Sequence, residues 1–115
     1  MKKKLLIAED EKIIRLLIKK ALGDRFDFEE AENGRAALAK AQSNEFDCVI
    51  TDVKMPGMDG LELLTSLRRI KPEAKVIVMT GSGPELLLSA KAGGAYSTLE
   101  KPFGINELMA TVSGI

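Results

Sequence analysis

The chain has 115 residues, with 17 basic and 17 acidic side chains, and 45% of its residues are hydrophobic. This length is typical of one domain, so we expect a single domain over residues 1–115. The balanced charge gives no overall positive field for nucleic acid or anionic lipid, and the absence of histidine excludes Ser–His and Cys–His catalysis.

Short apolar runs alternate with amphipathic segments from the start of the chain. Leu5–Ala8 predicts a buried strand, and residues 11–22 predict a helix. The inward face of this helix should carry Ile14, Leu17, Ile18 and Ala21. Residues 26–29 alternate as a half-exposed edge strand does, and Asn33–Gly34 begins a second helix.

A third strand and helix follow. Cys48–Asp52 predicts a strand, and Asp59 and Glu62 have the spacing of a capping box at the start of a helix. Pro72 ends that helix. Its apolar face should carry Leu63, Leu64, Leu67 and Ile70.

The last two units are shorter. Val76–Thr80 predicts a fourth strand, and Pro84 suits the first turn of a fourth helix. Residues 95–99 predict a weak fifth strand, and a short fifth helix should carry Ile105, Leu108, Met109 and Val112. Five strands in strict alternation with helices predict an α/β fold, with a parallel sheet and helices on both faces.

Polar residues follow the ends of these strands, where ligands of such sheets bind. They are three acids, a hydroxyl, a glycine and a lysine: Glu9, Asp10, Asp52, Thr80, Gly81 and Lys101. Because crowded carboxylates repel one another, a divalent cation would relieve the conflict, and a few oxygen ligands suit Mg²⁺. A metal, a lysine and a hydroxyl around one carboxylate favour phosphoryl transfer to that carboxylate.

Four strings resemble the receiver domain of two-component response regulators: LLIAEDE, ITDVKMPGMDG, VIVMTG and LEKPF. Their order and spacing agree with that family over nearly the whole chain, apart from one residue lost between Thr80 and Lys101. The resemblance implies a flavodoxin-like (βα)5 fold with strand order 2-1-3-4-5. It also implies a signalling switch whose only catalysis is its own phosphorylation and dephosphorylation.

The resemblance assigns the acidic residues to a phosphorylation site. Asp52 matches the phosphoacceptor and is also a metal ligand. Asp10 matches a direct Mg²⁺ ligand, and Glu9 matches its acidic partner. The backbone carbonyl of Lys54 matches the third protein ligand of the ion.

The resemblance also identifies the groups that contact the phosphoryl group. Thr80, followed by Gly81, matches the switch hydroxyl, and Lys101 matches the lysine that pairs with the phosphoryl oxygens. The Lys101–Pro102 peptide bond matches one that is often cis in this family.

Partners follow from the same resemblance. The phosphoryl donor would be a sensor histidine kinase or a histidine phosphotransfer protein, in agreement with the absence of histidine here. Ile13 and Leu16 lie outside the predicted core face of the first helix and are candidates for kinase docking. The fourth helix, fifth strand and fifth helix would form the output surface.

The single cysteine, Cys48, and the lack of a signal peptide or membrane span favour the cytoplasm.

The sequence departs from the family pattern in three respects. The family usually has an aromatic residue three positions before the lysine, where this chain has Thr98; Tyr96 is a candidate substitute, since a strand's period of two puts both on one face. Glu9 replaces the more common aspartate. Lys54 and Ser82 are candidates for tuning the lifetime of the phosphoryl group.

Three other interpretations are open at the level of sequence. A degenerate receiver would act only as a protein-binding module, and the missing aromatic residue favours that option. A phosphatase of the haloacid-dehalogenase type needs an aspartate two residues after the nucleophile, where Lys54 stands. Gly81–Gly83 before a helix could cradle a phosphate, but it lacks the G-x-x-x-x-G-K-[ST] pattern of nucleotide binding.

Overall fold

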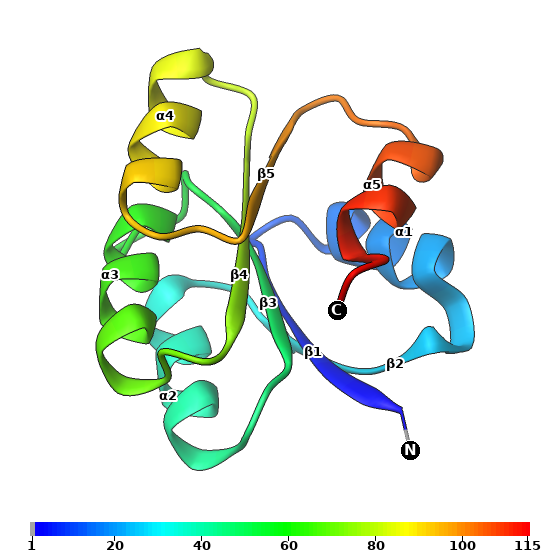
Figure 1. Cartoon of the computed structure of the whole chain (residues 1–115), viewed down its shortest axis with the longest axis horizontal. Coiled ribbons are helices and arrows are strands. Elements are labelled where there is room, and N and C mark those ends of the chain that lie inside the picture. The colour runs from blue at the N-terminus through cyan, green and yellow to red at the C-terminus, as the bar shows by residue number, and fades with distance from the viewer. Residues whose placement is uncertain (1) are drawn as a thin grey trace.

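Five parallel strands form one sheet in the order β2-β1-β3-β4-β5 (Figure 1). The computed structural model describes residues 2–115. The strands are β1 (Lys3–Ala8), β2 (Phe26–Ala31), β3 (Cys48–Asp52), β4 (Lys75–Thr80) and β5 (Ser97–Glu100). The predicted fold class and strand order are confirmed.

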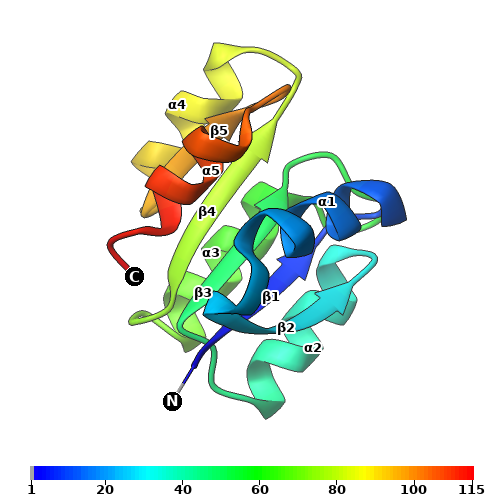
Figure 2. The same cartoon turned by 90° about the vertical axis from the view of Figure 1, so that its right-hand side faces the viewer.

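Helices cover both faces of this sheet, as Figure 1 and the turned view in Figure 2 show. They are α1 (Lys12–Leu22), α2 (Gly34–Ser43), α3 (Gly60–Ile70), α4 (Pro84–Ala92) and α5 (Ile105–Val112), with a short 3-10 helix, η1 (Gly23–Arg25), after α1. Helices α2, α3 and α4 lie on one face, and α1 and α5 lie on the other. None of the helices in residues 2–115 has the length and apolar character needed to cross a membrane.

The core consists of two layers, one on each face of the sheet. Val49 and Val78 belong to the layer under α2, α3 and α4. Ile50 and Ile77 belong to the layer under α1 and α5. Alternate residues of a strand point to opposite faces, so the central strands β3 and β4 are buried on both sides and read as continuous apolar runs.

Local capping fixes where α2 and α3 begin. The Asn33 side chain accepts a hydrogen bond from the Ala36 N–H at 2.8 Å. Asp59 and Glu62 form the predicted capping box, because the Glu62 N–H donates to Asp59 Oδ1 at 2.9 Å and the Asp59 N–H donates to Glu62 Oε1 at 3.3 Å.

The start of α3 lies directly against the end of β3. A Cβ atom at Gly60 would stand 2.1 Å from the backbone oxygen of Asp52, so only glycine fits this approach. The Gly60 N–H also donates to the Val53 carbonyl at 2.8 Å. This contact fixes the loop that follows Asp52 relative to the strand that carries it.

Two positions predicted for the apolar faces of α1 and α3 are exposed, and Ile105 at the start of α5 is exposed as well. Leu17 has 56% of its surface exposed, because the buried face of α1 is formed by Arg15, Ile18 and Leu22 instead. Ile70 is 41% exposed, since it is the last residue of α3 and lies beyond Leu67, where the buried face ends. The prediction for Leu17 was wrong, because α1 turns Arg15 toward the sheet and Leu17 toward solvent.

Candidate functional site

Three acidic side chains meet at the carboxyl ends of β1 and β3. Asp52 is the last residue of β3, and Glu9 and Asp10 follow β1 directly. One carboxylate oxygen from each residue lies within 4.8 Å of the others. Glu9 and Asp52 are buried and Asp10 is exposed. The adjacency of β1 and β3 brings these residues together, although the sequence separates them by more than forty positions.

Lys101 connects two of these acids. Its Nζ donates to Glu9 Oε1 at 2.9 Å and lies 3.2 Å from Asp52 Oδ2. Burial of the ammonium group lowers the pKa of Lys101, but the hydrogen bond to Glu9 and the charge of Asp52 outweigh burial, so this pKa is raised overall. The Lys101–Pro102 peptide bond is cis. Lys101 therefore carries a positive charge to the acids at neutral pH.

Glu9 is the most deeply buried of the three acids, with 0% of its surface exposed. Its Oε2 accepts from the Glu11 N–H at 3.0 Å, and its Oε1 accepts from Lys101. Burial raises the pKa of Glu9, and the neighbouring Asp10 and Asp52 raise it further. The hydrogen bonds from Glu11 and Lys101 only partly offset these effects. The structure thus contains the electrostatic conflict that the crowded carboxylates predict.

Thr80 ends β4, the strand beside β3. It lies one residue beyond the position that pairs with Asp52 and is only 1% exposed. Its Oγ1 accepts from the Ser82 N–H at 3.1 Å, and accepting this bond leaves the hydroxyl proton available to donate. Gly81 follows it and lies beside Lys101, because a Cβ atom at Gly81 would be in ordinary van der Waals contact with the Lys101 Cβ at 3.5 Å.

Comparison with known proteins identifies the family that shares these motifs and this fold. Residues 5–113 match the family model of the response regulator receiver domain. The chain belongs to the response regulator receiver domain family.

Two relatives of this receiver domain differ in how much of their own length the match spans. It is 34% identical over 114 residues to sporulation initiation phosphotransferase F of Bacillus subtilis, which covers 97% of this chain and 92% of the relative. It is 38% identical over 108 residues to the DNA-binding transcriptional regulator NtrC of Salmonella typhimurium, which covers 92% of this chain. That match spans only 23% of NtrC.

Solved structures agree with the fold assignment. The chemotaxis protein CheY4 of Vibrio cholerae superposes on the receiver domain with a TM-score of 0.89 at 34% identity. This superposition covers 100% of the receiver domain and 99% of the CheY4 chain. The receiver domain thus shares its whole fold with that protein.

The donor set of the receiver domain fits a hard divalent cation. Asp10 and Asp52 offer carboxylate oxygens, and Glu9 lies beside them within the same cluster. Few carboxylates and room for retained waters are the conditions that suit Mg²⁺. Lys54, whose carbonyl the family resemblance predicts as a ligand of the ion, is exposed in the loop after β3 and lines the same surface hollow as Asp10.

Tyr96 lies apart from this site. Its N–H donates to the carbonyl of Val76 at 2.8 Å, near the opposite end of β4 from Thr80. The rise of a strand separates those two positions by about 13 Å. Tyr96 directly precedes β5, and its hydroxyl lies close to Gly114. The backbone of Tyr96 therefore lies away from Thr80, and its role as a substitute for the switch aromatic residue stays a prediction.

Helix α1 carries both predicted and unpredicted features of the receiver domain. Ile13 and Leu16 are 58% and 40% exposed, in agreement with their predicted place outside the core. Sequence reasoning overlooked Arg15, which is only 7% exposed and contacts the backbone of the acid pair. Its spacing with Ile18 and Leu22, at three and seven residues, is the one signal that could have revealed its inward position.

Proposed function

We propose that residues 1–115 act as one receiver domain that accepts a phosphoryl group on Asp52, with Mg²⁺ as cofactor. The proposal is carried by one observation: Asp52 belongs to a cluster of three acids within 4.8 Å and lies 3.2 Å from the charged Lys101. The ion would be held by Asp10, Asp52 and the Lys54 carbonyl, with Glu9 as the remaining acid. When bound, Mg²⁺ supplies charge neutralisation for the phosphoryl oxygens.

Transfer exchanges one bond to phosphorus for another. An Asp52 carboxylate oxygen forms the new P–O bond while the N–P bond to the donor imidazole breaks, and the imidazole keeps the electron pair. Lys101 pairs with a phosphoryl oxygen, and the Thr80 hydroxyl donates to another. Glu9 holds the Lys101 ammonium at 2.9 Å and so keeps it aimed at the site. Attack of water on phosphorus then releases inorganic phosphate and restores Asp52.

Acetyl phosphate with Mg²⁺ tests this function without a partner protein. The intact mass should rise by one phosphoryl group, and Asp52→Asn should abolish the gain. Asp27→Asn serves as the matched control because Asp27 is an exposed residue of β2. A wild-type chain that takes up no phosphoryl group would instead support a degenerate receiver that only binds partners.

The donor would be a sensor histidine kinase or a histidine phosphotransfer protein, which docks through Ile13 and Leu16. These side chains are exposed on α1, and α1 begins two residues after Asp10. Ile13→Glu combined with Leu16→Glu should stop transfer from a phosphorylated protein donor and leave acetyl phosphate labelling intact. Leu88→Glu on α4 is the control, because Leu88 is even more exposed than Ile13 and Leu16. Loss of both activities would show that the double variant had damaged the fold.

Phosphorylation would change the surface formed by α4, β5 and α5, which passes the signal to an output domain or a downstream protein.

Lys54 and Ser82 would set the phosphoryl lifetime, because Lys54 follows Asp52 closely and the Ser82 N–H bonds to the Thr80 hydroxyl at 3.1 Å. A dephosphorylation rate that Lys54→Ala leaves unchanged would remove Lys54 from this role.

A further inference from the structure

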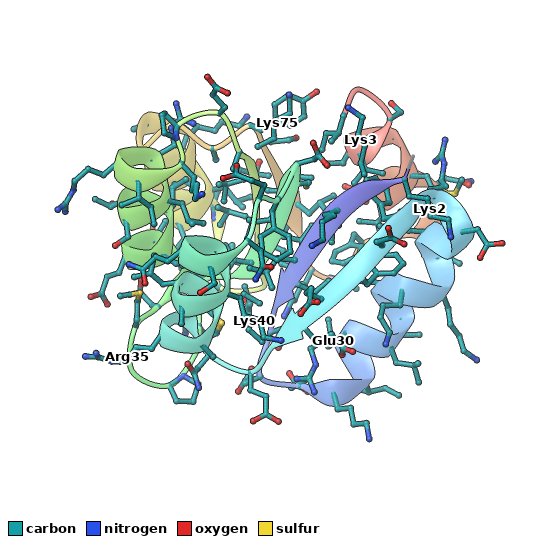
Figure 3. All side chains as sticks on the ribbon, turned by 90° about the horizontal axis from the view of Figure 1, so that it is seen from below. Lys2, Lys3, Glu30, Arg35, Lys40 and Lys75 are labelled. Carbon is teal, nitrogen blue, oxygen red and sulfur yellow. The ribbon has the colours of Figure 1, made fainter. Side chains whose placement is uncertain are left out.

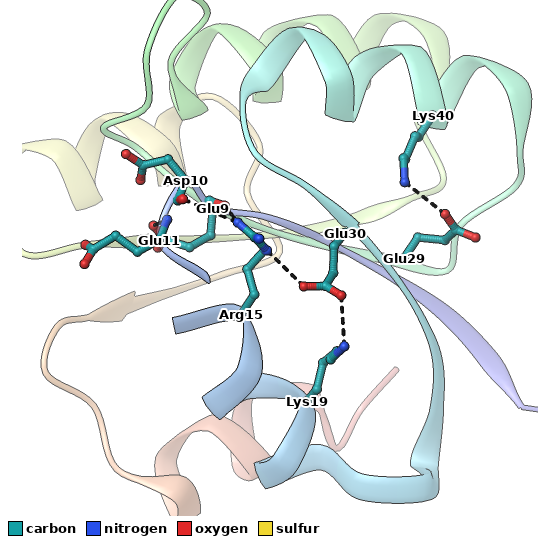
Figure 4. A network of polar contacts seen from close by, with 8 residues as sticks. All are labelled: Glu9, Asp10, Glu11, Arg15, Lys19, Glu29, Glu30 and Lys40. Atoms are coloured by element: carbon teal, nitrogen blue, oxygen red, sulfur yellow. Dashed lines mark hydrogen bonds and ion pairs between the residues drawn. The ribbon is translucent and has the colours of Figure 1, made fainter. Parts of the chain in front are cut away.

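A buried guanidinium group on α1 contacts the backbone of the loop that carries Glu9 and Asp10. Arg15 of α1 donates from Nη1 to the Glu9 carbonyl at 2.7 Å and, more weakly, to the Asp10 carbonyl at 3.4 Å (Figure 4). Only 7% of Arg15 is exposed. Its contacts go to the backbone of the two acids, so it leaves their carboxylates available to other partners.

The guanidinium is itself held by the edge strand of the sheet. Arg15 Nε donates to Glu30 Oε1 at 2.9 Å, and Lys19 Nζ donates to Glu30 Oε2 at the same distance. Figure 3 shows Glu30 on the α1 side of β2, opposite Lys40. Glu30 therefore neutralises Arg15 and orients it, while Lys19 occupies the remaining carboxylate oxygen.

A second contact fixes the same loop from the sheet. The Glu9 N–H donates to the carbonyl of Ala31, the last residue of β2, at 3.0 Å. The peptide groups around Glu9 are thus bonded on both sides, by β2 and by Arg15. Arginine suits this position because its planar fork reaches the carbonyls and Glu30 at once, whereas a lysine offers one nitrogen only.

We propose that Arg15 is a positioning residue for the metal site, and that it holds the loop after β1 so that Glu9 and Asp10 converge on Asp52 before the ion binds. This inference rests on the proposed function, because it assigns Arg15 a role at the same Mg²⁺ site. Its effect should fall on Mg²⁺ affinity, since the guanidinium contacts the ligand-bearing backbone and none of the reacting groups.

Mg²⁺ titrations followed by amide chemical shifts test the proposal directly. Arg15→Met keeps the length and apolar stem of the side chain but removes its donors. We expect the Kd for Mg²⁺ to rise about tenfold, as for other outer contacts that orient metal ligands. Lys19→Met is the matched control: it removes a cation from the same Glu30 cluster without touching the acid pair, and the Kd should change by less than about twofold.

Phosphorylation kinetics separate positioning from general damage. At saturating Mg²⁺, Arg15→Met should be labelled by acetyl phosphate at nearly the wild-type rate, with only the Mg²⁺ dependence shifted. Arg15→Lys should recover part of the lost affinity, because one nitrogen can still donate to the Glu9 carbonyl. An unchanged Kd in Arg15→Met, or a low rate that excess Mg²⁺ does not restore, would overturn the proposal.

A further variant keeps the test valid if Arg15→Met fails to fold. Glu30→Gln retains Arg15 but removes the charge that orients it, so the Mg²⁺ Kd should again rise; an unchanged Kd would contradict the inference. Wild-type protein that binds no Mg²⁺ would instead overturn the proposed function itself. Wild-type binding with equal affinity in the Arg15 and Glu30 variants would overturn only the positioning role.

Discussion

At the scale of single residues, the site depends on how Glu9 is used. Both of its carboxylate oxygens accept hydrogen bonds, one from the Glu11 N–H and one from Lys101. An aspartate is one methylene shorter, so its carboxylate would reach less far toward Lys101 from the same backbone position. The longer side chain therefore places the acid as the anchor of Lys101, beside the carboxylates of Asp10 and Asp52.

Glu9→Gln should raise the free energy of unfolding and lower the affinity for Mg²⁺. Burial raises the pKa of Glu9, so its charged form costs the folded state free energy that is incurred as the pH rises above the ordinary value of 4.5. A neutral glutamine avoids that cost, and we expect a higher free energy of unfolding at neutral pH, measured by urea denaturation. Mg²⁺ affinity should fall about tenfold.

Glu11→Gln is the control for this substitution, because Glu11 is the exposed neighbour that contacts Glu9 only through its backbone N–H. It should leave both the free energy of unfolding and the Mg²⁺ Kd near their wild-type values. A Glu9→Gln variant that is less stable than wild type at neutral pH would show that the Lys101 ion pair outweighs the burial of the acid.

At the scale of elements, the helices hold the loops that carry the site. Helix α1 buries Arg15 together with Ile18 and Leu22, so its inward face includes a cation. The hydrogen bond to the Glu9 carbonyl and the ion pair with Glu30 offset the cost of burying that charge. Helix α3 begins against the Asp52 carbonyl and anchors the other acidic loop. Both contacts bring a helix end to the backbone beside an acid.

Gly60→Ala should disturb the phosphorylation site through the backbone. The new methyl group would stand 2.1 Å from the Asp52 oxygen, a backbone atom that cannot move without shifting the end of β3. We expect a loss of about 1–3 kcal/mol in the free energy of unfolding. Acetyl phosphate labelling of Asp52 should also slow.

Gly104→Ala provides the comparison for this prediction, because no atom lies within 4 Å of the position a Cβ would take there. Alanine is the poorer N-cap, but it also restricts the unfolded chain, and these opposing effects should keep the net change in stability below about 1 kcal/mol. Equal losses in the two variants would mean that the close approach of α3 to β3 does not matter.

At the scale of the whole molecule, strand order assembles the site. β1 and β3 are neighbours and unite the three acids, while β4 and β5 add Thr80 and Lys101 to the same edge. The edge strand β2 contributes Glu30, which α1 reaches through Arg15 and Lys19 (Figure 4). Every strand of the sheet thus contributes to the site. Strands β1, β3, β4 and β5 lead to its residues, and β2 supports it indirectly through Glu30 and Arg15.

Glu30 should make the stability of the whole fold sensitive to acid. The hydrogen bond from Lys19 lowers the pKa of Glu30, and Arg15 lowers it further, against a smaller opposing effect of burial. The stabilisation is therefore present above the ordinary value of 4.5 and is lost as the pH falls through the lower folded-state pKa. Urea denaturation between about pH 7 and about pH 3 should show the wild-type advantage over Glu30→Gln shrinking. A constant difference would contradict this assignment.

Sequence alone determined the elements and the acidic residues, because both depend on neighbours along the chain. Periods of two and 3.6, the Asp59–Glu62 capping box and the polar ends of apolar runs are local signals. The strand order came from the family resemblance and not from these patterns.

Only the tertiary structure decided which side of each element faces the site. Arg15 and Glu30 lie fifteen residues apart, and their contact forms only when α1 packs beside β2. Tyr96 falls near the amino end of β4 because β5 pairs with β4 in parallel, with Ser97 opposite Ile77. Such placements depend on the packing of segments that are distant in sequence, and no periodicity within one segment encodes them.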